Sequence, residues 1–332
     1  MRAQNDKPRK PVICLMGPTA CGKSKIALDL TRKLNLEIVS VDSALVYRGM
    51  DIGTAKPNIE ERRQVPHHLI DILDPAERFS TGEFRRAALD LIQAIHERGK
   101  IPLLVGGTML YFRSLLQGLA LLPEADSAIR AEIELEAERI GWERMHGLLA
   151  RVDPASAAKI HQNDPQRIQR ALEVFRISGR PLSEICRNDI PQNPSFFPIP
   201  VKIVPEDRHK LHDRIAHRFL AMLDAGLIEE VENLLARGDL NPSYPSVRAV
   251  GYRQVWAYLH GETTRETMVE KAITATRQLA KRQLTWLRKE SGLFLFTMEC
   301  TNLAARILSD VEPLIHEMDQ IQYQSGDDFH VY

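Results

Sequence analysis

The stretch Gly17-Pro18-Thr19-Ala20-Cys21-Gly22-Lys23-Ser24 decides the fold of this chain. It follows the apolar run 12–16 and precedes the helical pattern 25–30, so a strand, a glycine-bounded loop and a helix come in succession. The glycines let the loop curl so that its N–H groups point at an anion, and the helix N-terminus adds its positive end. We therefore predict a phosphate-binding loop over residues 17–24, in which Lys23 reaches the outer phosphates and the Ser24 hydroxyl holds a magnesium ion.

The first part of the chain alternates between apolar runs and helical patterns. Strands are predicted at 12–16, 37–41 and 101–105, helices after the phosphate loop, at 84–98 and from Leu110, and a loop at 49–68. This alternation predicts an α/β fold, a parallel P-loop NTPase-like sheet with flanking helices. Asp42 and Thr108 come just after the second and third strands, and ligands bind at that edge of open α/β sheets.

The pattern changes after Leu122-Pro123. Residues 125–190 show helical periodicity with breaks at Asp153-Pro154 and Asp164-Pro165, and the proline-rich stretch 191–200 predicts the end of this region. A strand at 201–204 and helices over 208–287 follow. We therefore predict four segments: a core, first part, at 1–122, a mostly helical insertion domain at 123–198, a core, second part, at 199–320, and a tail at 321–332.

Composition excludes several classes of protein. The 44 basic residues balance the 44 acidic ones, so contact with nucleic acid must come from local basic patches. The four cysteines form no CxxC pair, which argues against a zinc site or a disulfide framework and favours a reducing, cytoplasmic setting. Apolar runs are too short to span a membrane, and His67-His68 is interpreted as polar surface because no third ligand is suitably spaced.

The third predicted strand ends in Gly106-Gly107, where P-loop ATPases usually carry an acidic residue. Only the second strand, which ends at Asp42, offers a carboxylate. This pattern disfavours a hydrolytic motor and favours group transfer. A small-molecule kinase and a non-catalytic RNA-binding protein remain alternatives at this point.

Three clusters of basic residues favour a polyanionic substrate. One is 166–170, and a second is 248–253, where arginines beside Tyr252 and Trp256 suit stacking on unpaired bases. The third lies on the helix predicted at 269–289. A helical wheel places Val269, Ile273, Ala280, Leu284 and Leu287 on one apolar stripe and Arg277, Lys281 and Arg288 on a neighbouring strip.

Taken together, these stretches resemble those of the bacterial tRNA dimethylallyltransferases, also called tRNA isopentenyl transferases. The resemblance rests on GPTACGKS at 17–24, SVDSALVYRGMDIGTAKP at 40–57, IPLLVGGTMLYF at 101–112, DPQRIQRALEV at 164–174, GYRQVWAYL at 251–259 and ATRQLAKRQLTWLR at 275–288. It implies transfer of the dimethylallyl group of dimethylallyl diphosphate to N6 of adenosine 37 in tRNAs that read codons starting with U. The resemblance also implies that diphosphate leaves and that Mg²⁺ is required. An adenylate isopentenyltransferase acting on free nucleotide is the nearer alternative.

The resemblance also implies roles for individual residues. The phosphate loop, residues Gly17, Pro18, Thr19, Ala20, Cys21, Gly22, Lys23 and Ser24, binds the diphosphate. Asp42 is our candidate general base for the adenine amine, with a magnesium anchor as its alternative role. Thr19, Thr108 and Arg218 complete the expected catalytic set, and Arg214 is the second choice for the arginine.

Contacts with the tRNA anticodon stem-loop are expected at positions that match the family. They are Asp42, Ser43, Ala44, Leu45, Thr108, Arg130, Gln166, Arg167, Ile168, Gln169, Arg170, Arg248, Ala249, Val250, Gly251, Tyr252, Arg253, Lys281, Arg282 and Arg288. The chain is expected to act as a cytoplasmic monomer.

Overall fold

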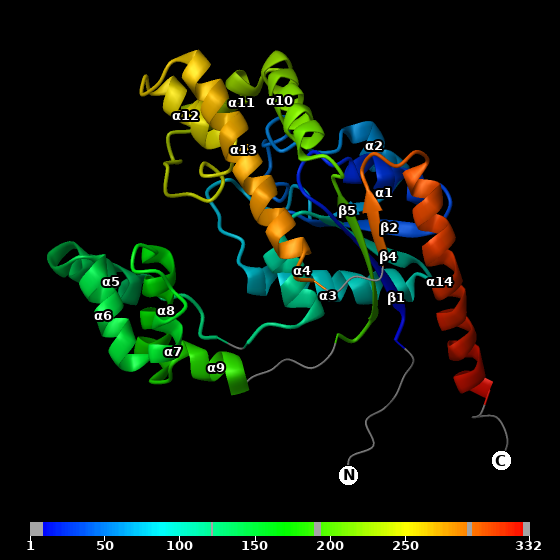
Figure 1. Cartoon of the computed structure of the whole chain (residues 1–332), viewed down its shortest axis with the longest axis horizontal. Coiled ribbons are helices and arrows are strands. Elements are labelled where there is room, and N and C mark those ends of the chain that lie inside the picture. Colours follow the sequence, from blue (N-terminus) through cyan, green and yellow to red (C-terminus); the bar gives the residue numbers. More distant parts are fainter. Residues whose placement is uncertain (1–8, 121, 189–193, 291–293, 328–332) are drawn as a thin grey trace, which may run out of the picture. The chain divides into compact units, whose positions relative to one another are not determined.

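The computed structural model describes residues 9–120, 122–188, 194–290 and 294–327 and divides into two compact units (Figure 1). Residues 117–193 form one unit, and the segments on either side form the other. The boundaries expected from sequence, at 122/123 and 198/199, lie five or six residues later than these divisions. The later boundary differs because a strand begins at Phe197, inside the proline-rich stretch.

A parallel sheet forms the centre of the larger unit, as the sequence predicts. Its strands are β1 (Pro11–Met16), β2 (Leu36–Val41), β3 (His67–His68), β4 (Ile101–Gly106), β5 (Phe197–Val204) and β6 (Phe294–Thr297). They run in the order β3-β2-β4-β1-β5-β6, and every pairing among the described strands is parallel. The strand that leads into the phosphate loop therefore lies near the middle of the sheet, between β4 and β5.

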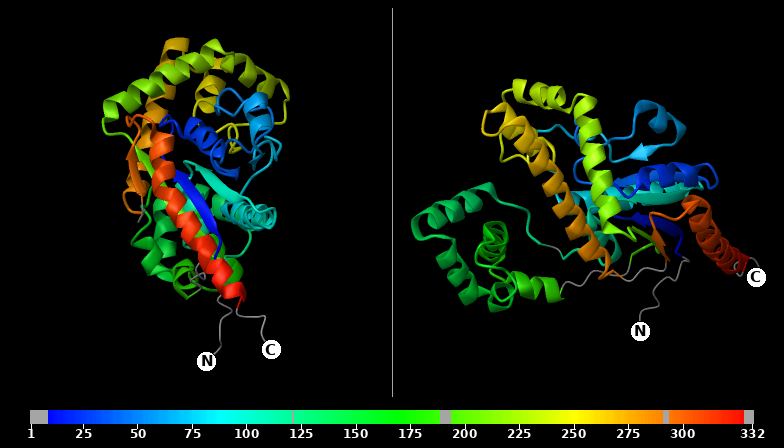
Figure 2. Two further views of the ribbon diagram at one scale, coloured as in Figure 1. Left: turned by 90° about the vertical axis from the view of Figure 1, so that its right-hand side faces the viewer. Right: turned by 45° about the horizontal axis from the view of Figure 1, so that its top comes forward.

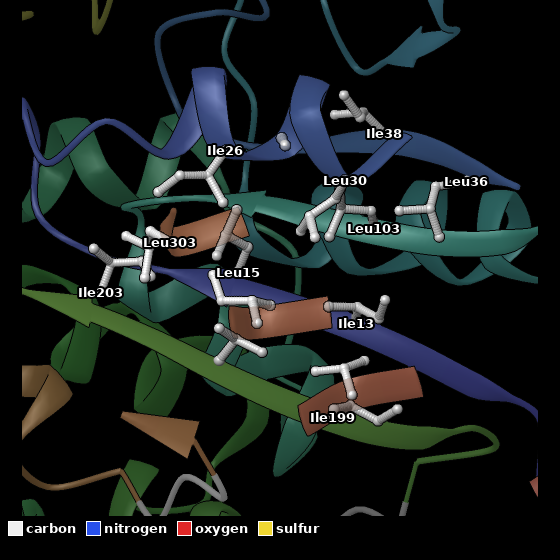
Figure 3. Close-up of a cluster of buried hydrophobic side chains, with 14 of the residues drawn as sticks. Ile13, Leu15, Ile26, Leu30, Leu36, Ile38, Leu103, Ile199, Ile203 and Leu303 are labelled. Atoms are coloured by element: carbon white, nitrogen blue, oxygen red, sulfur yellow. The ribbon is translucent and has the colours of Figure 1, made fainter. Parts of the chain in front are cut away.

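Helices cover both faces of the sheet because β1 is apolar on both sides. Ile13 and Leu15 pack with α1 (Lys23–Thr31) and α14 (Leu303–Asp327), as Figure 3 shows. Val12, Cys14 and Met16 pack with α3 (Thr81–Glu97) and α4 (Met109–Leu116). Figure 2 shows α14 running along the sheet beside β1. Both faces of a strand being apolar is typical of a central strand in a parallel sheet.

Several elements differ from the prediction. The predicted loop at 49–68 contains α2 (Ile59–Gln64) and β3. Helix α2 begins at a capping box of Asn58 and Glu61 but has no buried residue, so hydrophobic periodicity could not reveal it.

The C-terminal region also differs from the prediction. It contains β6 and the long α14, where the sequence placed no strand and a tail from residue 321. Residues Leu303, Ile307, Val311 and Ile315 of α14 are buried at a spacing of four, which is the signal that marks this helix. Residues 328–332 of the expected tail lie outside the described residues.

Four helices form a lobe at one end of the strands: α10 (Arg208–Asp224), α11 (Leu227–Ala236), α12 (Tyr252–Leu259) and α13 (Arg265–Leu287) (Figure 1). Glu230 of α11 accepts the backbone N–H groups of Asp51, Ile52 and Gly53 and the Tyr252 hydroxyl, the last at 2.5 Å. A Cβ atom on Gly53 would lie 2.5 Å from the Tyr252 ring, so only glycine allows this approach. These contacts fix the segment that follows β2 against the lobe.

The smaller unit is helical, as predicted. It contains α5 (Ser127–Ile140), α6 (Trp142–Val152), α7 (Pro154–Ala157), α8 (Pro165–Ser178) and α9 (Leu182–Asn188). The two predicted breaks are helix starts, because the carboxylates of Asp153 and Asp164 accept backbone N–H groups in the first turns of α7 and α8. No helix in the described part of the chain is long and apolar enough to cross a membrane.

Glu37 on β2 is a buried carboxylate held by two cations and a histidine. Arg98, His68 and Lys100 surround it at 2.6, 2.7 and 3.1 Å. Burial opposes its ionisation, but the hydrogen bonds from these groups outweigh burial and lower the pKa of Glu37 from 4.5 to about 2. The stabilisation is therefore present above pH 4.5 and is lost as the pH falls toward 2.

We expect Glu37→Gln to lower the free energy of unfolding at pH 7 by about 3 kcal/mol, because Arg98, Lys100 and His68 lose their shared carboxylate partner. Urea unfolding at pH 7 and pH 3 measures this difference, which should shrink at the lower pH. Glu60→Gln, at an exposed position on α2, is the matched control. An equal loss at both pH values would contradict the assignment.

Candidate functional site

The phosphate loop has the geometry that its sequence predicts. It connects β1 to α1, and Gly22 caps the helix with φ of 95°, a conformation that favours glycine. A Cβ atom on Gly17 would lie 2.7 Å from Cys21 Sγ and 2.8 Å from the Ile203 carbonyl oxygen. Lys23 Nζ donates to the carbonyl oxygens of Gly17 and Pro18 at 2.9 and 2.7 Å, so its ammonium lies over the loop.

Part of the loop lines a cavity of about 460 Å³. The residues that reach this cavity are Thr19, Ala20, Gly22, Lys23 and Ser24. Gly17, Pro18 and Cys21 do not line it, and the Cys21 side chain is buried in the hydrophobic cluster under α1. These three positions shape the loop, while the other five face the cavity.

Asp42, at the carboxyl end of β2, lines the same cavity. Its Oδ1 accepts the Ala44 N–H at 2.8 Å, and its Oδ2 accepts no hydrogen bond from the described residues. Thr108 fixes the backbone on both sides of Asp42, because its N–H donates to the Val41 carbonyl and its Oγ1 accepts the Ser43 N–H, each at 3.2 Å. The structure thus brings the predicted carboxylate and threonine together across β2 and β4.

Arg218 reaches the phosphate loop from α10. Its Nη2 donates to Thr19 Oγ1 at 2.5 Å, which links two predicted site residues that are distant in sequence. Burial lowers the pKa of Arg218, and the nearby Asp42 carboxylate opposes that shift. Arg214, one turn earlier on the same helix, also lines the cavity. Both candidate arginines therefore face the phosphate loop.

Gln283 of α13 was not predicted from the sequence. Its Oε1 accepts the Thr19 N–H and its Nε2 donates to the Gly107 carbonyl oxygen, both at 2.9 Å. A Cβ atom on Gly107 would lie 2.4 Å from this Nε2, so glycine at the end of β4 leaves room for the amide. No local pattern indicates this contact, since 264 positions separate Thr19 from Gln283.

A second cavity, of about 530 Å³, meets the first at Thr19, Asp42, Gly107, Arg218 and Gln283. Its other walls carry most of the second predicted basic cluster, together with Ser43, Ala44, Thr108 and Arg282. The members of that cluster lining it are Arg248, Ala249, Val250, Gly251 and Tyr252. The carboxylate and the arginine thus lie between a phosphate-loop cavity and a second cavity with arginines on its wall.

Two predictions about aromatic residues are wrong. Tyr252 and Trp256 are 1% and 5% exposed and belong to the core of the helical lobe. Burial and the Glu230 carboxylate also raise the pKa of Tyr252, so its hydroxyl stays a donor. These rings are therefore unavailable for stacking on a base. The sequence is misleading here because arginines near both rings are typical of a surface segment.

The apolar stripe of α13 is also shifted from the prediction. Its buried residues are Met268, Ala272, Thr276, Ala280 and Leu287. Val269, Ile273 and Leu284 are only partly buried. Two members of the predicted basic strip, Lys281 and Arg288, are exposed on the surface of α13.

The first basic cluster lies in the smaller unit and is partly structural. Glu173 is fully buried and accepts hydrogen bonds from Arg130 and Arg170, at 2.8 and 2.6 Å. The Ile168 side chain is in the core of this unit, so it cannot contact a ligand as the prediction implied. Gln166 and Arg167 are exposed, and Gln169 bonds Glu134. Only part of this cluster is therefore free to meet a polyanion.

The phosphate-loop cavity also contains the buried hydroxyl of Ser40. Ser40 is 3% exposed, lines the cavity, and its Oγ has no hydrogen-bond partner among the described residues. A buried hydroxyl without a partner is costly and indicates a polar group supplied by a ligand or by water. Together with Ser24 and Asp42, this oxygen-rich wall suits a hydrated Mg²⁺ ion, which prefers oxygen ligands and keeps several waters.

These features define a P-loop α/β protein in which two joined cavities meet at a carboxylate, a threonine and an arginine. The family model described as IPP transferase matches residues 45–290, and the chain belongs to this family. The resemblance noted in the sequence is thereby confirmed.

Relatives and solved structures agree with this membership. The chain is 60% identical to a tRNA dimethylallyltransferase of Methylococcus capsulatus over 281 residues, covering 85% of this chain and 90% of the relative. It is similar in structure to a tRNA isopentenylpyrophosphate transferase of Bacillus halodurans, with a TM-score of 0.69, 37% identity and coverage of 95% and 99%. A eukaryotic dimethylallyltransferase acting on tRNA matches with a TM-score of 0.81, 27% identity and coverage of 93% and 80%.

Proposed function

We propose that this protein transfers the dimethylallyl group of dimethylallyl diphosphate to N6 of adenosine 37 in tRNA. The observation that carries the proposal is the meeting of the two cavities at Asp42, Thr19 and Arg218. The phosphate loop offers a site for the diphosphate on one side, and the cavity lined by Arg248 and Arg282 offers a site for the nucleotide on the other. The names of the relatives and the family support the same reaction.

In this reaction N6 of adenine attacks C1 of the dimethylallyl group, the C1–O bond breaks, and diphosphate leaves. The adenine amine is a weak nucleophile because its lone pair is delocalised into the ring. We assign the general base to Asp42, and its Oδ2, which accepts no hydrogen bond from a described residue, supports this assignment. The N–H groups of the phosphate loop, Lys23 and Arg218 would stabilise the charge that develops on the diphosphate.

We propose Mg²⁺ as the cofactor, held by the Ser24 hydroxyl with Ser40 and Asp42 nearby. The unpartnered Ser40 Oγ supports this site. A bound magnesium ion would neutralise part of the diphosphate charge.

Adenosine 37 lies in a single-stranded loop, so its extrusion costs only unstacking, about a few kcal/mol.

Arg248 and Arg282 should contribute to binding of the tRNA and not of the diphosphate. We expect Arg248→Gln to raise the KM for tRNA by about 10-fold, because a charged contact worth about 1–2 kcal/mol is removed, while the KM for dimethylallyl diphosphate stays unchanged. Steady-state kinetics with each substrate varied in turn measures the two constants. Arg265→Gln, exposed at the start of α13, is the matched control. A rise in both KM values would contradict separate sites.

A further inference from the structure

We propose that Gln283 is a positioning residue for the transfer reaction. Its side-chain amide holds Thr19, and through Thr19 also Arg218, at a fixed place relative to the end of β4. This inference rests on the proposed function and adds to it a residue that neither touches the reacting atoms nor carries charge.

The hydrogen bonds of Gln283 use both ends of its amide. Oε1 takes the backbone N–H of Thr19 in the phosphate loop, and Nε2 donates to the Gly107 carbonyl, each at 2.9 Å. Thr19 in turn accepts from Arg218 Nη2. One side chain therefore ties α13 to the phosphate loop and to the strand end beside Thr108.

Gln283 lies between the site proposed for the diphosphate and the site proposed for the nucleotide. Gln283 lines both cavities, and its helix also supplies Arg282 and Trp286 to the wall of the second cavity. The amide of Gln283 thus connects Thr19, in the loop proposed to bind the diphosphate, to the helix that lines the cavity proposed for the nucleotide. Transfer requires the attacking nitrogen and C1 to be held at about 3–3.5 Å, and a misplacement of about 1 Å costs about 100-fold in rate.

The neighbouring glycine supports the same role. Gly107 has no left-handed conformation that would require glycine, yet a Cβ atom there would collide with Gln283 Nε2 at 2.4 Å. The Gly17 carbonyl oxygen would be the next atom, at 3.2 Å. Space at Gly107 is therefore occupied mainly by the amide of Gln283, and a methyl group there should displace it.

The test replaces Gln283 by Met, which keeps the volume and removes both hydrogen bonds. We expect kcat to fall by about 10- to 100-fold, while the KM for each substrate and the affinity for inorganic pyrophosphate change by less than about threefold. Glu270→Met, at an exposed position of the same helix outside both cavities and the groove between α10 and α13, should behave like the wild type. Gln283→Asn, too short to reach both partners, should resemble Gln283→Met and serves if the latter unfolds.

A double variant tests whether Gly107 acts on kcat through Gln283. Gly107→Ala should lower kcat in the wild-type protein but should add little to Gln283→Ala, because the two changes remove the same link. The inference is overturned if Gln283→Met keeps kcat within about threefold of wild type, or if its pyrophosphate affinity falls as much as its kcat. Absence of prenyl transfer by the wild type would instead overturn the proposed function.

An independent observation carries a second inference. The groove between α10 and α13 has a volume of about 320 Å³. Its cations are Arg208, Arg277, Lys281 and Arg288, and no carboxylate is among its described lining residues. Arg277 Nε is buried without a hydrogen-bond partner in the described part of the chain. We infer that this groove binds a backbone phosphate of the tRNA substrate.

Unpaired charge distinguishes this groove from other basic positions. Arg98, Arg130 and Arg237 are paired with carboxylates at 2.6 to 2.8 Å, whereas none of the four groove cations forms an ion pair with a described residue. Burial and Arg277 also lower the pKa of His212, another lining residue, as a positive potential requires. Arg208 and Arg277 lie outside the contacts expected from the family.

Salt dependence of tRNA binding tests the groove. We expect Arg277→Gln to reduce the slope of log K against log salt by about 0.7–0.9, the value for one lost phosphate contact, and Arg265→Gln to leave it unchanged. An unchanged slope for Arg277→Gln would overturn this inference. A second outcome also overturns it. If inorganic phosphate at constant ionic strength raises the stability of the wild type but not of Arg277→Gln, and the salt slopes of tRNA binding are equal for the two proteins, the groove binds free phosphate and not the tRNA.

Discussion

Replacing Asp42 by Asn should lower kcat for prenyl transfer by about 10²–10⁴-fold, the usual contribution of a general base. Asparagine is chosen because its Oδ1 can still accept the Ala44 N–H that Asp42 accepts at 2.8 Å. The local turn is therefore preserved, and only the proton acceptor is lost. Single-turnover rates with saturating tRNA and dimethylallyl diphosphate measure the change. Asp90→Asn, exposed on α3, is the control.

The same variant separates the two roles considered for Asp42. A general base affects the rate at saturating Mg²⁺, whereas a magnesium anchor mainly raises the Mg²⁺ concentration needed for half-maximal rate. Titration of Mg²⁺ with the variant distinguishes them. Recovery of the wild-type rate at high Mg²⁺ would contradict the assignment of Asp42 as base.

Replacing Lys23 by Met should lower kcat/KM for dimethylallyl diphosphate by about 10²–10³-fold, because one cation that stabilises the leaving diphosphate is removed. Lys23 Nζ lies over the loop, bonded to the carbonyls of Gly17 and Pro18, within reach of an anion held there. Binding of tRNA alone should not change, since Lys23 lines the phosphate-loop cavity and not the second one.

Calorimetry with inorganic pyrophosphate and filter binding with tRNA measure the two affinities for this variant. Lys33→Met, exposed near the end of α1, is the control for loss of a lysine. Equal weakening of tRNA and pyrophosphate binding would mean that the loop had lost its fold, and intact pyrophosphate binding would contradict the role of Lys23.

Local patterns in the sequence predict much of this fold and site. A strand followed by a glycine-bounded loop and Lys23 is a contiguous signal, and the apolar run that ends at Asp42 is another. Because parallel strands end at one edge of a sheet, the proximity of Asp42, Thr108 and the loop follows from the fold class alone. The helical character of the smaller unit follows in the same way from its periodicity.

Some contacts between distant segments have no local signal in the sequence. Gln283 is an ordinary polar residue of a long helix, and only the packing of α13 against the sheet brings it to Thr19. Ser40 has no neighbour in sequence that marks it as an unpartnered hydroxyl. The burial of Tyr252 is not evident from the sequence for the same reason, because it depends on Glu230 and Gly53, which come from other segments.

The most direct test is incubation of the purified protein with radiolabelled dimethylallyl diphosphate, Mg²⁺ and either unmodified tRNA or AMP. We predict that label appears in tRNA, at adenosine 37, and not in AMP. Label in AMP alone would contradict the account and assign the protein to the free-nucleotide branch. Transfer of the γ-phosphate of ATP with no label in either acceptor would mean that the phosphate loop serves a kinase.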